Sequence, residues 1–245
     1  MNSKILFRRR TYDRPPMHPL MPAPRAVIFD LDGTLVDSFG IVLFAWNESV
    51  GRILERTFEL HELMARFGPT ELAMVRREIP LDCADDACRN FMRAYESDHA
   101  RLAKVFDGIP QLLDALRDAC MPLGLMTGKG RDTCDVTLAK LGWTDRFASV
   151  ITGDECPKPK PAPDGVLQVA RELGVPPSQC VFIGDSPADI GAGNAAGMKT
   201  IWAGWHPVYE EEIAQLQPTL IARSPDDVAR FLGLHSSPRT RGEAG

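Results

Sequence analysis

The sequence predicts an α/β protein with a Rossmann-like, doubly wound parallel sheet and a small α-helical cap domain inserted into it. Two observations carry this prediction. Short apolar runs alternate with amphipathic helical patterns along most of the chain, as they do in parallel sheets with helices on both faces. Residues 38–104 break that alternation, because they contain helical patterns and no convincing strand. A composition of 44% hydrophobic and 25% charged residues is ordinary for a globular protein.

The expected strands are five short apolar runs separated by helical patterns. Two of these patterns stop at Gly142 and Gly174, where glycine favours the end of a helix. A later pattern begins with Ser224 and Pro225, which suit the N-cap and the first helical position. The strand candidates are residues 27–29, 121–126, 149–151, 180–183 and 199–203.

The cap is predicted between the first two strands. The stretch is too long for a single crossover, and "FGIVLFAWNESVGRIL" and "ADDACRNFMRAYESDHARL" are amphipathic at helical spacing. We therefore expect a Rossmann-like catalytic core formed by residues 25–37 and 105–234, with a helical cap at 38–104. Residues 1–24 are expected to form a disordered arm and residues 235–245 a tail.

Charge and cysteine usage narrow the class of protein. The formal net charge is −5, and the basic side chains concentrate in the first 25 residues, so the rest is strongly acidic. An acidic body argues against general nucleic-acid binding and against a membrane surface. None of the six cysteines forms a C-x-x-C pair, which favours reduced thiols in a cytoplasmic protein. We expect a monomer or a homodimer.

Polar residues follow the predicted strands at the points where those strands end. In an open parallel sheet, ligands bind in the crevice outside the carboxyl ends of the strands, so these residues should converge on one place. They are Asp30 and Asp32, then Thr127, Gly128 and Lys129, then the lysines of "PKPKPAPD", and finally Asp185, Ser186 and Asp189.

The spacing of the four aspartates predicts a metal site. Asp30 and Asp32 are two residues apart on an extended chain and point to the same side, while Asp185 and Asp189 are four apart and can share a face. Clustered carboxylates repel one another unless a cation lies among them, and hard oxygen ligands suit Mg²⁺. Lysine and hydroxyl donors beside magnesium in turn suit a phosphate.

These segments resemble the four motifs of the haloacid dehalogenase superfamily. The matching stretches are "DLDGTLVDS", "LMTGK", the lysine of "KPAPD", and "GDSPADI", in that family's order along the chain. The helical insertion also lies where the family places its small α-helical cap. The resemblance is greatest to the phosphoglycolate phosphatase-like branch, whose members are aspartate-nucleophile phosphatases.

The resemblance implies a role for each core residue. Asp30 would attack phosphorus and form an aspartyl-phosphate, and Asp32 would act as general acid and then general base. Thr127 and the amide of Gly128 would hold phosphate oxygens, while Lys160 would neutralise charge on the nucleophile and the phosphoryl group.

The cofactor implied by the resemblance is Mg²⁺. Its ligands would be Asp30, the backbone carbonyl of Asp32, and Asp185, with Asp189 direct or through water.

Several of these residues have simpler interpretations. Asp30 and Asp32 could cap a strand-to-turn junction, and Asp185 could be the N-cap of the helix that starts near Pro187. Lys158 competes with Lys160 for the third motif. Lys129 is expected to be a solvated charge at a helix start.

The favoured function is a Mg²⁺-dependent phosphatase for a small, phosphoglycolate-like phosphomonoester. Alternatives are a pyrophosphatase or phosphomutase on the same core, or a catalytically silent phosphate-binding protein. In the cap, Gly68-Pro69 would aim Arg66, Thr70 and Glu71 toward the core as substrate contacts, although a plain interhelical turn explains Gly68-Pro69 equally well.

Overall fold

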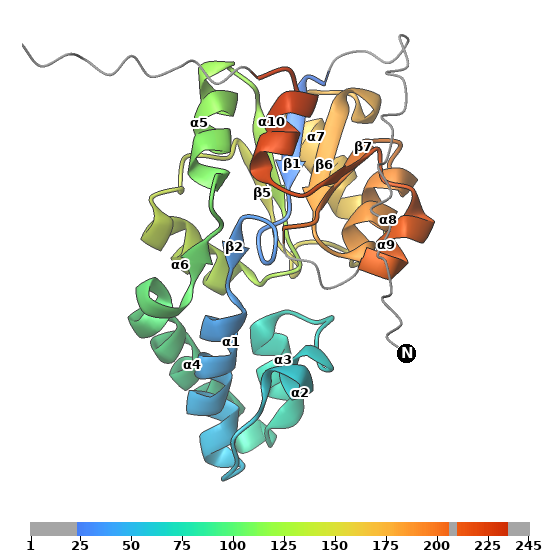
Figure 1. Ribbon diagram of the computed structural model, residues 1–245. Helices are drawn as coiled ribbons and strands as arrows, with labels where there is room; N and C mark the ends of the chain where they lie inside the picture. The colour runs from blue at the N-terminus through green and yellow to red at the C-terminus, as the bar shows by residue number, and fades with distance from the viewer. Residues whose placement is uncertain (1–23, 206–209, 235–245) are drawn as a thin grey trace, which may run out of the picture.

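The computed structural model describes residues 24–205 and 210–234, so the expected arm and tail lie outside the described residues apart from Pro24. A sheet flanked by helices occupies one half of the molecule, and helices α1–α4 form the other half (Figure 1). The strands are β1 (Ala26–Phe29), β2 (Val36–Asp37), β3 (Lys104–Val105), β4 (Leu123–Met126), β5 (Ser149–Ile151), β6 (Cys180–Gly184), β7 (Lys199–Ala203) and β8 (Leu220–Ala222). The helices are α1 (Phe39–Trp46), η1 (Asn47–Gly51), α2 (Leu60–Met64), α3 (Glu71–Glu78), α4 (Leu81–Leu102), α5 (Ile109–Asp118), α6 (Arg131–Leu141), α7 (Asp164–Glu172), η2 (Pro177–Gln179), α8 (Pro187–Ala195), α9 (Glu210–Leu216) and α10 (Pro225–Phe231).

The main sheet is parallel and doubly wound, as predicted. Its six strands run in the order β5-β4-β1-β6-β7-β8. The chain proceeds outward from β1 to β5 and then returns to the other side of β1 to build β6, β7 and β8. The strand order therefore reverses beside β1, and the carboxyl end of β1 is where a ligand site is expected in this architecture.

Strand β1 shows why the predicted strands are apolar throughout. Val27 and Phe29 face a cluster that includes residues of α5, α6 and α10, whereas Ala26 and Ile28 face a second cluster with α7. All four side chains are fully buried, because helices cover both faces of the sheet.

All five predicted strands are present, and two elements were missed. The missed ones are β8 at the sheet edge and the short antiparallel ladder of β2 with β3. Gly142 and Gly174 adopt the left-handed conformation, with φ of 68° and 67°, just beyond α6 and α7, as their positions predicted. Ser224 caps α10 in a capping box with Asp227.

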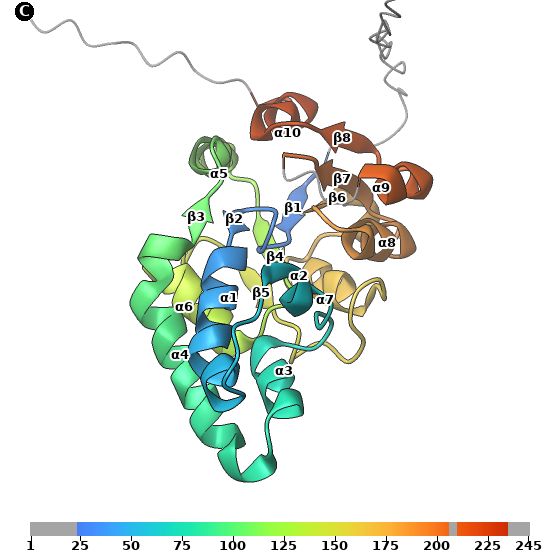
Figure 2. The ribbon, with the colours of Figure 1, turned by 60° about the horizontal axis from the view of Figure 1, so that its bottom comes forward.

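Helices α1 to α4 pack mainly on one another and also touch the sheet half. Figure 2 shows the long helix α4 running alongside α1, with α6 next to it, and contacts join α4 to both. Trp46, Phe91 and Tyr95 are buried there and belong to the same apolar cluster as Val27 and Phe29. The two halves thus share a continuous apolar core.

Both passages of the chain between the two halves run through the β2–β3 ladder. Val36 pairs with Val105 and Asp37 with Lys104 in antiparallel register. The chain leaves the sheet half along β2 and returns along β3, so the segment between them begins and ends at one place.

Two further expectations concern the described residues. No helix in residues 24–205 and 210–234 is long and apolar enough to cross a bilayer. All six cysteines are free thiols.

Candidate active site

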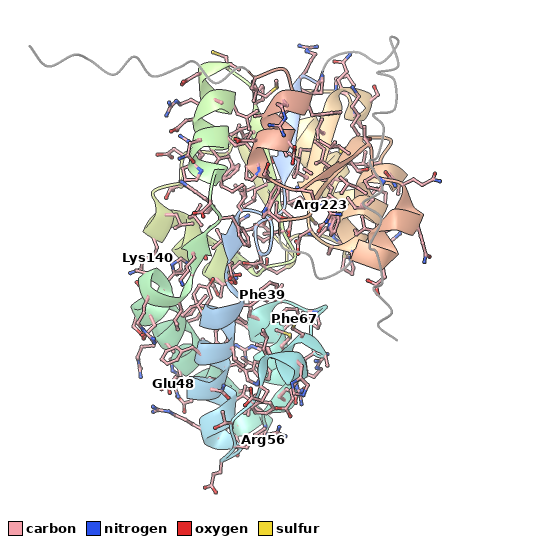
Figure 3. The ribbon with its side chains drawn as sticks, viewed as in Figure 1. Phe39, Glu48, Arg56, Phe67, Lys140 and Arg223 are labelled. Carbon is pink, nitrogen blue, oxygen red and sulfur yellow. The ribbon has the colours of Figure 1, made fainter. Side chains whose placement is uncertain are left out.

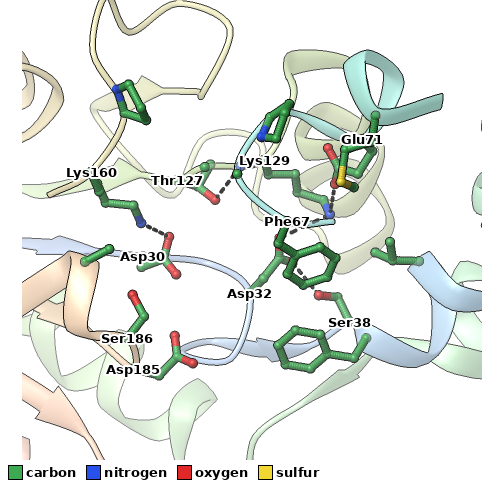
Figure 4. Close-up of a pocket in the computed structure, with 18 residues that line it drawn as sticks. Asp30, Asp32, Ser38, Phe67, Glu71, Thr127, Lys129, Lys160, Asp185 and Ser186 are labelled. Carbon is green, nitrogen blue, oxygen red and sulfur yellow. Dashed lines mark hydrogen bonds and ion pairs between the residues drawn. The ribbon is translucent and has the colours of Figure 1, made fainter. Parts of the chain in front are cut away.

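The carboxyl ends of β1, β4 and β6 open into a pocket of about 250 Å³ that helices α1 and α3 close from the other side (Figure 4). Its sheet-side wall is mostly charged and hydroxyl side chains, with Pro159 and Ala188 among them, and its cap-side wall is mostly apolar. The sheet-side residues include Asp30, Asp32, Thr127, Gly128, Lys129, Lys160, Asp185 and Ser186. The residues from the cap side are Ser38, Phe39, Val42, Phe67, Gly68, Pro69, Glu71 and Met74.

Asp30 extends from the end of the central strand and is held by Lys160. The backbone N–H of Asp30 donates to the carbonyl of Ile183 on β6 at 2.9 Å, which continues the sheet to this residue. Lys160 Nζ donates to Asp30 Oδ1 at 2.8 Å and to Asp189 Oδ1 at 2.6 Å. Lys158 is exposed, so the lysine in the site is Lys160.

Burial and neighbouring charges shift the pKa values of Asp30 and Lys160. Burial raises the pKa of Asp30 to about 7, against the attraction of Lys160, and the charge of Asp189 adds to the increase. Burial alone would lower the pKa of Lys160, but Asp189 and Asp30 outweigh it and raise that pKa above its usual range. Lys160 is therefore a permanent cation in the site.

Asp185 fits closely beneath the loop that follows β1. Gly33 has φ of 81°, and a Cβ there would stand 2.3 Å from Asp185 Oδ2, so only glycine is accommodated. Thr34 Oγ1 donates to Asp185 Oδ1 at 3.2 Å, and Trp202 Nε1 donates to the Asp185 carbonyl at 2.8 Å. Burial, followed by the charges of Asp189 and Asp30, raises the pKa of Asp185 well above its ordinary value.

Three carboxylates form a cluster that fits a divalent cation. Oxygens of Asp30, Asp185 and Asp189 all lie within 4.8 Å of one another, and all three residues are buried. Lys160 pairs with Asp30 and Asp189 but not with Asp185, so the three carboxyl groups share one cation. Hard oxygen donors in such a cluster are the ligands that Mg²⁺ prefers. The Asp32 side chain is not part of the cluster.

Asp32 lines the same pocket but has different partners. Ser38 Oγ donates to Asp32 Oδ1, and Lys129 Nζ donates to Asp32 Oδ2 at 3.2 Å. The Asp32 side chain is 25% exposed, which is more than the side chains of Asp30, Glu71 and Asp189.

The prediction that Lys129 is a solvated charge is wrong. Its side chain has no exposed area, and Nζ also donates to Glu71 Oε1 at 2.7 Å and lies 4.9 Å from the centre of the Tyr95 ring. Burial disfavours the charged amine, but Asp32 and then Glu71 raise the pKa of Lys129 well above its usual range. Lys129 is buried because α3 and α4 cover the start of α6.

Thr127 and Gly128 occupy the end of β4 facing the pocket. The backbone N–H of Lys129 donates to Thr127 Oγ1 at 3.2 Å, which leaves the hydroxyl proton available for a ligand. No atom lies within 4 Å of the position that a Gly128 Cβ would take, so the backbone is open there. Both features suit the predicted contact with an oxyanion.

The predicted N-cap of α8 is also wrong. The N-cap is Ser186 rather than Asp185, and it forms a capping box in which Asp189 Oδ2 accepts from the Ser186 amide at 3.0 Å. A Cβ at Gly184 would stand 2.3 Å from Asp189 Cβ, so this glycine admits Asp189 to the site. Asp185 is instead directed at the loop after β1.

Of the three cap residues predicted to contact substrate, only Glu71 lines the pocket. Glu71 Oε2 accepts from the backbone N–H of Gly130 at 2.9 Å, in addition to its bond with Lys129. Thr70 packs against Gly130 and Gly153 without lining the pocket. Arg66 is directed away from it, because its guanidinium pairs with Glu78 at 3.4 Å and donates to the Glu62 carbonyl.

Several pocket residues were not predicted as site residues. Ser38, Phe39 and Val42 come from the start of α1, and Phe67 and Met74 come from the segment around α3. The signal that could have found Ser38 is its place as the last residue of the first motif, at the boundary of the cap. The apolar residues carried no such signal, because apolar residues on helices usually pack in a core.

Comparison with known proteins identifies the class. The sequence profile of the Haloacid dehalogenase-like hydrolase family matches residues 27–203, and the chain belongs to that family. It is an enzyme of the phosphatase type within it. A phosphoglycolate phosphatase from Xylella fastidiosa is 33% identical over 84% of this chain and 92% of its own length.

Two further relatives agree with this assignment. The pyrophosphatase PpaX from Bacillus velezensis is 27% identical, over 85% of this chain and 96% of its own. The crystal structure of a predicted phosphoglycolate phosphatase from Haemophilus somnus superimposes with a TM-score of 0.75, covering 86% of this chain and 99% of that one at 23% identity, which supports the fold. The resemblance stated from the motifs is confirmed.

Proposed function

We propose that the protein is a Mg²⁺-dependent phosphatase that hydrolyses a small phosphorylated metabolite, a phosphomonoester, through an aspartyl-phosphate at Asp30. The observation that carries this proposal is the position of the Asp30 carboxylate. It lies at the end of the central strand, bonded to Lys160 and within the cluster of Asp185 and Asp189, and it faces a pocket closed by the cap.

The first step is transfer of the phosphoryl group to Asp30. An Asp30 oxygen forms a bond to phosphorus as the bond from phosphorus to the leaving-group oxygen breaks. Asp32 gives its proton to that oxygen, so the alcohol leaves neutral. The Lys160 ammonium, the Thr127 hydroxyl and the Gly128 amide stabilise the charge on the phosphoryl oxygens.

The second step regenerates the enzyme. Asp32, now ionised, accepts a proton from a water molecule that attacks the phosphorus of the aspartyl-phosphate. The bond between phosphorus and the Asp30 oxygen breaks, and inorganic phosphate is released. Asp32 therefore recovers the proton that it gave to the alcohol, and the cycle balances.

Asp30, Asp185 and Asp189, with the backbone carbonyl of Asp32, would hold Mg²⁺. The ion would supply charge neutralisation, both among these carboxylates and on the phosphoryl oxygens. Without it, burial first and then repulsion from neighbouring carboxylates favour the protonated forms, as the raised pKa values of Asp30 and Asp185 indicate.

The experiment is phosphate release from a panel of small phosphate compounds, including phosphoglycolate and pyrophosphate, with Mg²⁺ or with EDTA. An Asp30→Asn variant is the control. We expect release that requires the metal and is lost in the variant. Silence toward the whole panel, from protein with an intact circular dichroism spectrum, would contradict the proposal and favour a phosphomutase or a phosphate-binding protein.

A further inference from the structure

The cap-side wall of the pocket is apolar except for Ser38 and Glu71. Phe39, Val42, Phe67 and Met74 all line it, and Met74 is 2% exposed. The phosphoryl group must lie against the polar sheet-side wall, next to Asp30. The leaving group of a bound phosphomonoester therefore extends toward these apolar side chains, beside Asp32.

Two aromatic rings stand where the leaving group would lie. Phe39, at the start of α1, stacks with Phe67, in the loop before α3, with centroids 6.1 Å apart and planes inclined by 16°. Figure 3 shows both rings at the end of the cap that faces the sheet. Phe67 is 41% exposed although it lines the pocket, so it presents ring surface that an apolar ligand could cover.

The cations of the pocket are already matched by carboxylates. Lys129 has its ammonium directed at Asp32, Glu71 and the Tyr95 ring, and its side chain has no exposed area, so it has no direction left for a ligand. Lys160 lies between Asp30 and Asp189, where the phosphoryl group is bound. Among the described residues that line the pocket, no other cation is present.

Beside the cap-side wall, two carboxylates share one cation, because Lys129 pairs with both Glu71 and Asp32. Glu71 is 6% exposed and lies at the pocket wall, and Arg66, the cap cation predicted to reach the substrate, pairs with Glu78 instead. A second anionic group on the substrate would thus approach Glu71 and Asp32, whose only cation, among the described residues that line the pocket, is the Lys129 already paired with both. Such juxtaposition of like charges disfavours a ligand strongly.

We propose that the preferred substrate is a phosphomonoester whose leaving group is uncharged and presents an apolar or aromatic face. A carboxylated alcohol such as glycolate, or a second phosphate, is disfavoured. This inference rests on the proposed function, because it assumes that the phosphoryl group occupies the site at Asp30. The substrate inferred here for this chain differs from the substrates after which the relatives are named.

The first test compares two substrates that differ only in charge. Phosphoglycolate and its neutral amide, phosphoglycolamide, have nearly the same size and the same phosphoryl group. We expect kcat/KM with Mg²⁺ to be at least tenfold higher for the amide, and phenyl phosphate to exceed phosphoglycolate by a larger factor. Higher kcat/KM for phosphoglycolate than for the amide would overturn the inference while leaving the proposed phosphatase intact.

The second test adds a cation to the apolar wall. Phe67→Arg should raise kcat/KM for phosphoglycolate relative to the amide by at least tenfold. The same variant should lower kcat/KM for phenyl phosphate. Leu54→Arg is the matched control, since Leu54 has the same 41% exposure and does not line the pocket. Leu54 lies two residues before Arg56, which Figure 3 shows at the end of the cap far from the sheet.

The outcomes of the two tests separate the two proposals. An unchanged ratio in Phe67→Arg, or the same change in Leu54→Arg, would overturn the assignment of this wall to the leaving group. Failure to hydrolyse any compound, by protein that is folded and loaded with Mg²⁺, would instead overturn the proposed function. In that case Phe67→Arg would be silent as well.

Discussion

Two lysines in the pocket are each held between two carboxylates, but their surroundings differ. Lys160 pairs with Asp30 and Asp189, which both belong to the sheet half, at the end of β1 and on α8. Lys129 pairs with Asp32 after β1 and with Glu71 on α3 of the cap. One arrangement is complete within the core, and the other exists only while the cap lies against it.

This difference separates the proposed nucleophile from the proposed acid and base. Asp30 is oriented entirely by groups of the core. Asp32 is oriented by Lys129, which is shared with the cap, and by Ser38 at the start of the cap. The position of Asp32 therefore depends on the cap, whereas that of Asp30 does not.

The largest effect is expected on removing the core lysine. Lys160→Met should lower kcat by about 10²–10³-fold for every substrate, because a charge that stabilises the transition state is lost. Lys158→Met is the matched control and should retain activity, since Lys158 is exposed. Equal losses in the two variants, measured by steady-state phosphate release, would remove the distinction between these lysines.

A smaller and more selective effect is expected at the lysine shared with the cap. Lys129→Met should misplace Asp32 and lower kcat/KM by roughly ten- to a hundredfold for alkyl phosphates. It should have much less effect on 4-nitrophenyl phosphate, whose leaving group needs no proton. Because an unpaired buried carboxylate destabilises a fold, the Lys129→Met/Glu71→Gln double variant should be measured as well. A uniform loss across leaving groups would contradict the positioning of Asp32 by Lys129.

Glu71, the cap residue that pairs with Lys129, should affect turnover less than either lysine does. Glu71→Gln keeps an oxygen that can accept from Gly130 but removes the charge opposite Lys129. We expect KM to rise by about two- to tenfold with little change in kcat, as loss of about 0.5–1.5 kcal/mol from one bond implies. Hydrogen exchange in α3 should increase at the same time. A large fall in kcat with unchanged exchange would show that Glu71 acts in the chemistry and not in closure.

The last effect is on stability as a function of pH, measured without metal, and not on turnover. An unfolded aspartate loses its proton near pH 3.8, but folded Asp30 holds it to about pH 7. The folded chain binds more protons between these values, so Asp30 makes the free energy of unfolding fall as pH rises from about 4 to 7. In EDTA, raising the pH from about 4 to 7 should lower the Tm of the wild type by several degrees more than that of Asp30→Asn. Adding Mg²⁺ should raise the Tm of the wild type more at pH 8 than at pH 5.

The core of the site was predictable from the sequence because its residues are fixed by local chain geometry. Asp30, Thr127 and Asp185 each follow a buried strand of a parallel sheet, and topology brings the ends of those strands together. Gly33 and Gly184 were also present as signals, since each permits a close approach of a carboxylate. Lys160 could be separated from Lys158 by its place before "PAPD".

The cap side was less predictable because its contacts join distant parts of the chain. Lys129 was expected to be solvated, as a lysine at a helix start usually is, and its burial depends on Glu71 in another segment. Arg66 was expected to reach the substrate, but Glu62 and Glu78 in its own segment hold it. The strand β8 escaped notice because it is a short and partly exposed edge strand.

The ladder of β2 with β3 has a consequence for how such enzymes diversify. Since Asp37 and Lys104 are paired neighbours, the whole intervening segment is spliced into the chain at a single point. Replacing it with a shorter or longer module would leave the path of the remaining chain unchanged, because the two ends would still meet across one strand spacing. Recombination at that point could exchange selectivity between homologues while Asp30, Lys160 and Asp189 kept their contacts with one another, and chimeras joined there are a direct route to new substrates.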